Sequence, residues 1–539
     1  MTRKKKSIPI HANRRPIDIN AWILGSSIAS LASAVHLIAE ANVPAPQIHI
    51  LESRNTPGDG ITTIGDWVNG YDLRPGCLPN FHTGCMEKLL ALVPSANVAG
   101  STLLNEIEEF RHRKTNDDAP ATHILTKGEK GIKRMETTGL GLNLRDRMKV
   151  MMLMLRSEEG LARRRIDQFF SKYFFESRFW VVFSTVFTFQ PWHSAAEFRR
   201  CLHRYLPEFK NLNVRKPLDC TQFNQFEWIV RPIIRFLQNQ GVDFRLCTKV
   251  TDIVSRSDRD VQTISAIHVS IDSFEEKITL LPDDIVIASL GSVTSGSLSG
   301  TNDRPPVRES MTAESDLCEN WSLWLTLGTK YPNFGDPYNF CTRVAESRLG
   351  AFTVTLRDPE FFERFAVLTR DKPGTGNLVS LKDSNWKINV CLLRQPFFTD
   401  QPEDIQIFWG YCLCPEREGQ FVRKPMLYCS GQEIIAELLW HLEFPSKSIL
   451  KNSTTIPCVM PRRTTSLLPR IRGDRPKVIP ENMANLAVIG QFAEIPDWTT
   501  ASMDYGVLGA QLAVGRLMDL DQQELMIKKR LCSSLKLLV

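Results

Sequence analysis

A strand–helix–strand pattern near the amino end constrains the fold of this chain more than any other feature. Residues 20–25 read as an apolar strand that ends at Gly25, and an amphipathic helix runs from the following small-residue turn to Glu40. After a proline-bearing loop, a second strand covers 48–51 and ends at Glu52. This length suits the crossover between two parallel strands. The pattern therefore predicts a βαβ unit of the Rossmann type.

The first turn of this unit is a serine-substituted form of a phosphate-binding turn. Residues 25–30 read Gly-Ser-Ser-Ile-Ala-Ser, which keeps the GxGxxG spacing with serine at the second and third glycine positions. A pyrophosphate must approach backbone N–H groups and the positive end of the following helix, and serine is small enough to allow this. Glu52 is placed to accept hydrogen bonds from ribose hydroxyls. A purely structural turn is the alternative, but Glu52 and the βαβ context favour a dinucleotide.

A second strand–turn–helix pattern, near the carboxyl end, indicates which dinucleotide binds. The segment 485–496 reads NLAVIGQFAEIP, and the segment 505–518 reads as an apolar helix. FAD proteins of this architecture commonly return such a strand and helix over the flavin, whereas the alternative is that they only complete the sheet. The two patterns together favour FAD. The residues predicted to bind it are Gly25, Ser27, Ile28, Ser30, Glu52, Gly58, Gly60, Arg74, Gly76, Val250, Gly291, Gly490, Gln491 and Phe492.

The length of the chain, 539 residues with 42% hydrophobic and 23% charged side chains, is enough for more than one packed unit. Residues 140–210 have a helical period and many aromatic side chains, which suits either the walls of an apolar ligand site or a plain helical core. Residues 242–290 alternate like strands. We predict a basic flexible arm (1–19), three FAD-binding segments (20–100, 221–300 and 481–520), a helical lid and substrate-tunnel region (101–220), a substrate domain (301–480) and a tail (521–539).

Charge and cysteine usage exclude several classes of partner. The net charge of +6, from 66 basic and 60 acidic residues, gives little reason to expect nucleic acid. The thirteen cysteines form no CxxC pair, so we expect no metal and reduced thiols in the cytoplasm. The basic run at 1–16 permits peripheral contact with an anionic membrane, although a solvated arm is favoured. No membrane span is expected, and the oligomeric state stays open, a homodimer included.

Several long motifs follow one another from about residue 20 to 520. They include WILGSSIASLASAVHLI at 22–38, QPWHSAAEF at 190–198 and NLAVIGQFAEIP at 485–496. In sequence and order these motifs resemble the FAD-dependent oleate hydratases, also called myosin-cross-reactive antigens. The resemblance implies an α/β fold with a Rossmann-type FAD-binding domain, an inserted substrate domain and a helical lid region. It also implies addition of water to a long-chain unsaturated fatty acid, with a flavin that takes no electrons across turnover.

The two acid–base positions of that family hold other residues in this chain. The family's Arg-Gly-Gly-Arg-Glu-Met motif aligns with 74–79, so Leu78 stands in place of the glutamate, and the family's tyrosine position is Cys201. Leucine cannot activate water, and a thiol is a weak acid that is often only a packing residue. The remaining titratable candidates for catalysis are Cys201, His82, Asp59 and His193. Both histidines have an alternative role as hydrogen-bonded core residues.

Three interpretations follow for an apolar alkene such as a fatty acid. The first is non-redox acid–base chemistry, meaning water addition, isomerisation or a related step, carried by residues other than the family pair. The second is a changed task in secondary metabolism, for instance on a polyketide or terpenoid chain. The third is a catalytically inactive lipid- or flavin-binding homologue. A flavin-dependent oxidoreductase is a further alternative, because a βαβ unit alone does not distinguish it from a hydratase.

Overall fold

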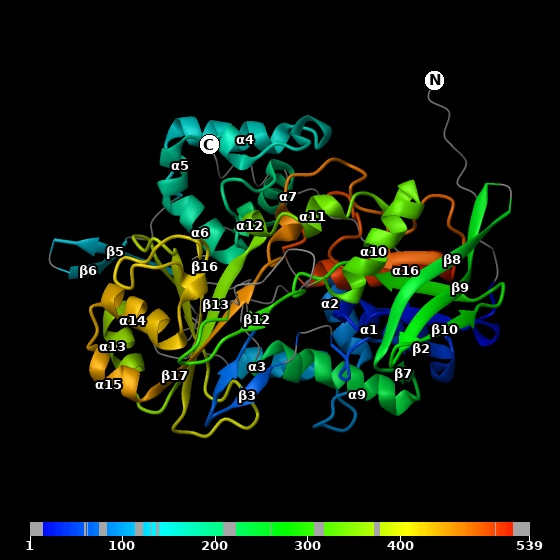
Figure 1. The fold of residues 1–539 in the computed structure, drawn as a ribbon, viewed down its shortest axis with the longest axis horizontal. Coiled ribbons are helices and arrows are strands. Elements are labelled where there is room, and N and C mark those ends of the chain that lie inside the picture. The colour runs from blue at the N-terminus through cyan, green and yellow to red at the C-terminus, as the bar shows by residue number, and fades with distance from the viewer. Residues whose placement is uncertain are drawn as a thin grey trace.

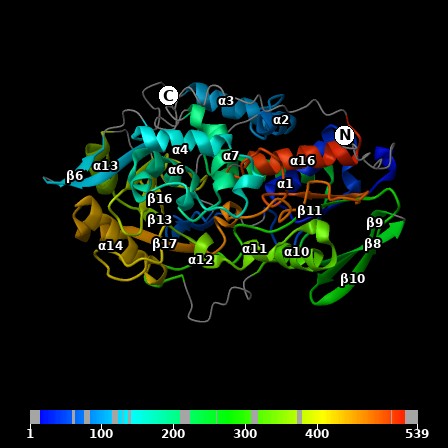
Figure 2. The same cartoon turned by 90° about the horizontal axis from the view of Figure 1, so that it is seen from above.

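Two main sheets lie side by side along the long axis of the computed structural model (Figure 1). One sheet is parallel and belongs to a Rossmann-type half, and the other is mixed and carries most of the helical insertions. Figure 2 shows the same two halves from above. The residues described are 14–58, 61, 63–74, 84–113, 122–129, 131–135, 140–208, 222–258, 260–306, 317–370, 378–501 and 503–520.

The parallel sheet joins strands from three distant parts of the chain. Its order is β18-β11-β1-β2-β7, and every neighbouring pair is parallel. All four residues of the central strand are buried, as expected when helices or other layers cover both faces. The predicted α/β fold is therefore confirmed. The strands are β1 (Ala21–Leu24), β2 (Ile48–Leu51), β7 (Asp243–Arg245), β11 (Ile285–Ser289) and β18 (Leu486–Ile489).

Small residues let two helices approach closely on one face of this sheet. A Cβ added at Gly506 in α16 (Asp504–Leu517) would lie 3.3 Å from the Cβ of Ala29 in α1 (Ile28–Ala39). Figure 2 shows these helices and α2 (Gly84–Leu92) on one side of the sheet, and α10 (Glu319–Lys330) on the other. The remaining elements of this half are α3 (Leu103–Arg113), α9 (Arg231–Gln240), β8 (Thr248–Asp258), β9 (Val261–Ile271) and β10 (Phe274–Thr279).

The larger sheet has eight strands in the order β12-β17-β13-β16-β15-β14-β5-β6. One face packs on the aromatic helical region and the other on α13, α14 and α15, so that two separate cores flank the sheet. The strands are β5 (Thr122–Gly128), β6 (Gly131–Arg134), β12 (Leu298–Ser299), β13 (Leu349–Leu356), β14 (Leu378–Leu381), β15 (Ile388–Leu392), β16 (Gln406–Cys412) and β17 (Ser453–Met460). The covering helices are α13 (Glu360–Thr369), α14 (Gly431–Leu442) and α15 (Ser446–Lys451).

The aromatic segment within 140–210 folds as α4 (Leu144–Leu155), α5 (Lys172–Glu176), α6 (Arg178–Phe187) and α7 (Ala195–Tyr205). Its rings pack on one another: the centroids of Phe170 and Phe174 are 3.9 Å apart, and those of Phe183 and Phe198 are 6.0 Å apart. These side chains are buried in one core with the large sheet. These rings therefore form a helical core, which is one of the two interpretations given for this segment.

Shorter elements complete the fold. Among the described helices, none combines the length and the apolar character needed to cross a membrane. The short elements are β3 (Ile64–Asp66), β4 (Gly70–Asp72), α11 (Tyr338–Cys341), α12 (Val344–Ser347), the 3₁₀ turns Pro16–Asp18, Ala45–Gln47, Glu159–Leu161, Ile166–Gln168, Leu206–Glu208, Pro332–Phe334, Met426–Tyr428 and Thr465–Leu467, and the π-helical turn Phe226–Val230.

Candidate functional site

The carboxyl ends of the parallel strands meet at one edge of the sheet, where ligands of this architecture bind. Gly25 follows β1, Glu52 follows β2 and Gly490 follows β18. Gly25 and Gly490 have φ of +89° and +92°, a region that favours glycine. The edge therefore collects the predicted turn, the predicted acidic residue and the late strand end in one place.

Glu52 is bound to the turn by hydroxyl and amide donors. Its Oε2 accepts hydrogen bonds from the backbone N–H (3.1 Å) and from the hydroxyl of Ser26. Its Oε1 accepts from the N–H of Arg54 at 3.0 Å and from the hydroxyl of Ser53 at 3.3 Å. The N–H of Gly58 donates to the Ser26 hydroxyl at 2.8 Å. Glu52 is 3% exposed, so this carboxylate is fully committed within the protein.

The other serines connect the turn to the neighbouring strand. Ser27 caps α1, and its hydroxyl accepts from the N–H of Ser30 at 3.3 Å. The Ser27 hydroxyl also lies 3.1 Å from that of Ser289, at the end of β11. A Cβ added at Gly490 would lie 3.3 Å from the same Ser289 hydroxyl. The amino-terminal turn and the late strand end therefore meet through one residue that the sequence analysis missed.

A small pocket of about 10 Å³ opens beside Gly25 and includes the predicted contact Val250. Asn320, at the start of α10, closes it: its amide nitrogen is 3.5 Å from the position of a Cβ on Gly25. A cavity of this size holds about one water molecule, so it is far smaller than a whole-ligand pocket. The lining residues are Leu24, Gly25, Leu51, Ser53, Thr248, Val250, Glu319, Asn320 and Leu323.

Other predicted cofactor contacts do not line this pocket. Phe492 is 1% exposed and stacks into an aromatic cluster with Trp321, at a centroid distance of 4.9 Å. A Cβ on Gly291 would lie 2.6 Å from that phenylalanine ring, so Gly291 makes room for packing. Arg74 pairs with Asp72 at 2.9 Å, beside the large sheet. Ile28 is a buried residue of α1, and Gln491 is partly exposed.

Five sequence-predicted positions lie outside the described residues. Three of them are the proposed catalytic candidates His82 and Asp59 and the family's glutamate position, Leu78. The other two are the predicted cofactor contacts Gly60 and Gly76.

The described catalytic candidates are fully buried. Cys201, in α7, is 0% exposed, and burial together with the nearby Glu197 carboxylate raises the pKa of its thiol well above the usual value. His193 is also 0% exposed. Its Nδ1 accepts a hydrogen bond from the N–H of Gln190 at 3.0 Å, and burial lowers its pKa to about 3. Cys201 therefore stays protonated, and His193 stays neutral, as a hydrogen-bonded core histidine does.

A buried charge network lies between α7 and the segment that follows Gly490. Glu197 Oε1 is 2.8 Å from Arg470 Nη2 and 3.2 Å from Arg475 Nη1. Glu494 pairs with Arg200 at 2.5 Å and with Arg470 at 3.0 Å. Burial alone would raise the pKa of Glu494, but Arg470, Arg200 and Arg475 outweigh it and lower the pKa to about 2. This α7 junction, Glu197, Arg200, Arg470, Arg475 and Glu494, fixes the helical region to the late strand end.

A pocket with an incompletely paired cation lies between the two halves of the chain. Arg394 follows β15, and its guanidinium lies 5.3 Å from the ring centroid of Phe110. Its Nε and Nη2 are buried without a hydrogen-bond partner among the described residues. The cavity volume is about 300 Å³, and Arg394 was not predicted because a single arginine in a loop carries no signal. The lining residues are Phe110, Gln222, Phe362, Leu393, Arg394, Gln395, Pro396, Gln406 and Ile407.

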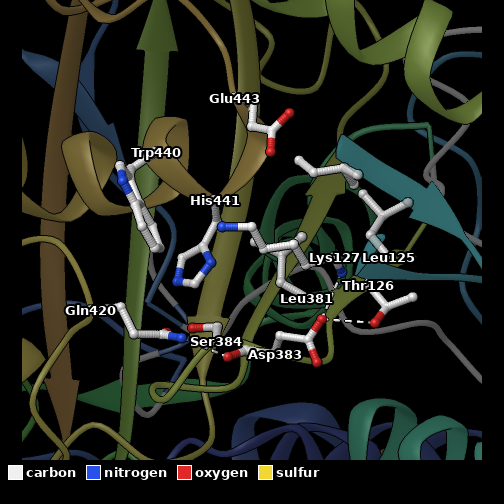
Figure 3. A pocket seen from close by; sticks show the side chains of 11 residues that line it. Leu125, Thr126, Lys127, Leu381, Asp383, Ser384, Gln420, Trp440, His441 and Glu443 are labelled. Atoms are coloured by element: carbon white, nitrogen blue, oxygen red, sulfur yellow. Dashed lines mark hydrogen bonds between the residues drawn. The ribbon is translucent and has the colours of Figure 1, made fainter. Parts of the chain in front are cut away.

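Another pocket, of about 130 Å³, lies on the large sheet at the far end from β7 (Figures 1 and 3). Trp440 and His441 from α14 form one wall, and Asp383 lies opposite (Figure 3). Asp383 accepts hydrogen bonds from the hydroxyl of Thr126 and the N–H of Lys127, each at 2.7 Å. This pocket shares no lining residue with the turn at Gly25, so we do not assign the cofactor to it.

Sequence relatives extend over nearly the whole chain. A family model described as the MCRA family matches residues 18–514. An oleate hydratase of Streptococcus pyogenes serotype M49 (strain NZ131) is 33% identical over 516 residues, which cover 93% of this chain and 86% of that protein. A linoleate hydratase of Lactiplantibacillus plantarum is 28% identical over 527 residues, which cover 89% of this chain and 90% of that protein.

Solved structures share the fold at low sequence identity. A cyclohexylamine oxidase from Brevibacterium oxydans IH-35A has a TM-score of 0.52 at 10% identity, covering 93% of this chain and 99% of that one. A redesigned variant of a putrescine oxidase has the same TM-score at 12% identity, with the same coverage. At these identities the likeness concerns the fold alone.

Proposed function

The chain belongs to the MCRA family, and from this premise we propose that it is an FAD-binding, fatty-acid-hydratase-like protein. Its substrate would be a long-chain unsaturated fatty acid or a similar apolar alkene. The chemistry would be non-redox acid–base chemistry: water addition, isomerisation or a related step. The observation that carries the proposal is the shared edge where Gly25, Glu52 and Gly490 come together.

The residues at this edge fit FAD. Gly25 places no side chain in the turn, and a phosphate at the start of α1 would lie at the positive end of that helix. Glu52 would accept hydrogen bonds from ribose hydroxyls, in exchange for some of its present donors. Bound FAD would supply a polarising ring system beside the substrate.

Arg394 supports an acidic substrate. A carboxylate would give the incompletely paired guanidinium a charge-assisted partner, since Nε and Nη2 form a fork that matches two carboxylate oxygens. Apolar side chains such as Phe362, Leu393 and Ile407 line the same pocket. The loop that carries Arg394 contacts the segment 224–230, because Phe397 O accepts from the N–H of Asn224 at 3.0 Å.

The link from this loop to the nucleotide edge is short. Phe226, in the π-helical turn, would lie 3.4 Å from a Cβ placed on Gly58. Gly58 in turn donates its N–H to the Ser26 hydroxyl. A series of contacts through Asn224, Phe226 and Gly58 therefore connects the Arg394 loop with the turn.

The second candidate is a catalytically inactive lipid- and flavin-binding homologue. The thiol of Cys201 is completely buried and its pKa is raised, so it is a poor proton donor at the family's tyrosine position. This favours the inactive homologue. Leucine at position 78 removes the family's glutamate as well. A flavin-dependent oxidoreductase is a further outcome of the substrate test below, and a secondary-metabolic task is a further alternative.

The cofactor is tested by titrating FAD into purified protein and following flavin fluorescence. Gly25→Asp and Glu52→Arg should each abolish binding, because the first places a carboxylate at the phosphate position and the second removes the ribose acceptor. Gly84→Asp is the matched control, since a Cβ at Gly84 meets nothing within 4 Å. Wild-type protein that ignores FAD would overturn the proposal.

The substrate is tested by mass spectrometry after incubation with oleic, linoleic and other unsaturated acids in the presence of FAD. A product heavier by one water molecule, without NAD(P)H or oxygen consumption, supports hydration, whereas cofactor-coupled turnover supports an oxidoreductase. If neither occurs, the pair Leu78→Glu and Cys201→Tyr tests whether those positions account for the loss. Position 201 is fully buried, so folding of this variant must be verified.

A further inference from the structure

Helix α4 carries an apolar stripe on its outer face. Leu144, Met148, Met152 and Leu155 are 72%, 52%, 54% and 60% exposed. Their spacing of four, four and three residues places all four on one side of an α-helix. Met151 lies beside them and is partly buried. Figure 1 shows α4 and α5 along the outer edge of the molecule.

The opposite face of α4 is the one that packs on the protein. Val150, Leu153 and Met154 are each no more than 1% exposed. Met154 O accepts hydrogen bonds from Arg199 Nε at 3.2 Å and from His203 Nε2 at 3.0 Å, both in α7. The orientation of α4 is therefore fixed from inside, and the outer stripe is held toward solvent.

Cations flank the stripe on both sides. At 100° per residue, Arg145 and Lys149 fall along one border of the stripe and Arg147 along the other. Arg156 follows the last turn, and Lys172 lies at the start of the neighbouring α5.

The acidic residues of α4 and of the two positions at 158 and 159 are engaged within the protein. Glu158 binds Arg200 at 2.6 Å, and Glu159 binds Arg472 at 3.2 Å. Asp146 is buried on the inner face of the helix. The border of the stripe is therefore net positive.

We propose that α4 is a docking surface for an anionic membrane, with the stripe in the acyl-chain boundary and the flanking cations at the headgroups. An amphipathic helix with an apolar face and Lys or Arg along its borders is the geometry that lies in a lipid interface. The basic residues add attraction to anionic lipids. The inference rests on this surface alone and is independent of the proposed function.

Charge argues against two other occupants of the stripe. A second copy of the chain would bring the same cationic borders together, which is repulsive. The chain's own segment 521–539 contains Lys528, Lys529 and Arg530 and would add further positive charge. An anionic bilayer is the complementary partner.

The test is flotation of purified full-length protein with vesicles of phosphatidylcholine and phosphatidylglycerol. Wild type should bind these vesicles, should bind pure phosphatidylcholine much less, and should release as NaCl is raised from about 0.1 M to about 0.5 M. Met148→Glu with Met152→Glu should lower the apparent affinity by about tenfold or more. Arg145→Glu with Lys149→Glu should lower it on anionic vesicles only.

Matched controls are Val367→Glu and Phe274→Glu, at apolar residues that are 81% and 79% exposed on other elements. These should bind vesicles as wild type does, and all variants should retain the wild-type circular dichroism spectrum and melting temperature. Absence of wild-type binding to anionic vesicles would overturn the proposal. Equal losses in controls and stripe variants would overturn it too, and so would a wild-type dimer that the stripe variants convert to monomers.

Discussion

The nucleotide turn and the α7 junction both bury a carboxylate, but they satisfy it with different chemistry. Glu52 accepts hydrogen bonds from hydroxyl and amide groups of residues close to it in the sequence or one strand away. Glu197 is surrounded by the guanidinium groups of Arg470 and Arg475, more than 270 positions later. The first set of donors is neutral, whereas the second carries full charge.

This difference separates a binding edge from a structural junction. Neutral donors can be exchanged for the hydroxyls of a ligand at little net cost, because each lost hydrogen bond to the carboxylate, worth about 1.5–3 kcal/mol, is replaced by another of the same kind. Buried ions cannot be exchanged in this way, since removing one partner leaves an uncompensated charge. We therefore expect substitutions at the junction to act on folding, and substitutions at the turn to act mainly on the ligand.

The largest effect is expected for Glu197→Gln. The substitution keeps the shape of the side chain but leaves Arg470 and Arg475 without their shared anion. We expect the free energy of unfolding to fall by about 3–5 kcal/mol, measured by urea denaturation. Glu159→Gln removes a similar carboxylate from an exposed pair with Arg472 and should leave stability unchanged. If both substitutions lowered the free energy of unfolding equally, the junction would be no more important for stability than an exposed ion pair.

The junction should also make the free energy of unfolding depend on pH in the acidic range. The pKa of Glu494 is about 2 in the folded protein and near its usual value of 4.5 when unfolded. A lowered folded-state pKa gives stability that is complete above about pH 5 and is lost as the pH falls toward 2, amounting to about 3 kcal/mol. Glu494→Gln should flatten this part of the stability curve. If the free energy of unfolding of the variant falls with pH as steeply as that of wild type, other carboxylates cause the acid sensitivity.

A smaller effect is expected in the turn, at Ser27. Ser27→Ala removes the hydroxyl that caps α1 and should cost about 1 kcal/mol, whereas Ser27→Gly should cost only a few tenths. Glycine also gives a phosphate more room, so Ser27→Gly should bind FAD at least as tightly as wild type. Thermal melting with and without FAD measures both quantities. Weaker FAD binding by the glycine variant would show that the serine hydroxyl contributes to the site.

The smallest change is expected at Cys201. Its thiol is buried and its pKa is raised, so iodoacetamide at neutral pH should leave it unmodified in the folded protein. Cys247, which is exposed, serves as the reactive control within the same sample. Peptide mapping by mass spectrometry distinguishes the two positions. Modification of Cys201 at the rate of Cys247 would indicate an open site at the family's tyrosine position.

The same contrast explains how much could be predicted from the sequence. The turn at 25–30 and Glu52 could be identified because their signal is local: one strand, one turn and one helix in succession. The parallel pairing of β1 with β2 followed from the crossover between them. The family could be predicted because its motifs are contiguous in the sequence, and the match to the MCRA family model over residues 18–514 confirms it.

The features that could not be predicted depend on distant contacts. Ser289 meets Ser27 across 262 positions, and no spacing rule indicates such a pair. Phe492 follows the late strand end as predicted, yet it packs into an aromatic cluster with Trp321 and Trp324. Pairing within the α7 junction depends on which helix covers which strand end, and that is decided by tertiary packing.

One consequence follows from the way Ser26, Ser53 and Arg54 satisfy Glu52 without any outside donor. A carboxylate that already has hydrogen-bond donors within the protein needs neither a local rearrangement nor added water when the nucleotide dissociates. Stripping the flavin with mild chaotrope should therefore yield a stable apoprotein, and simple mixing should restore the yellow form without a refolding step.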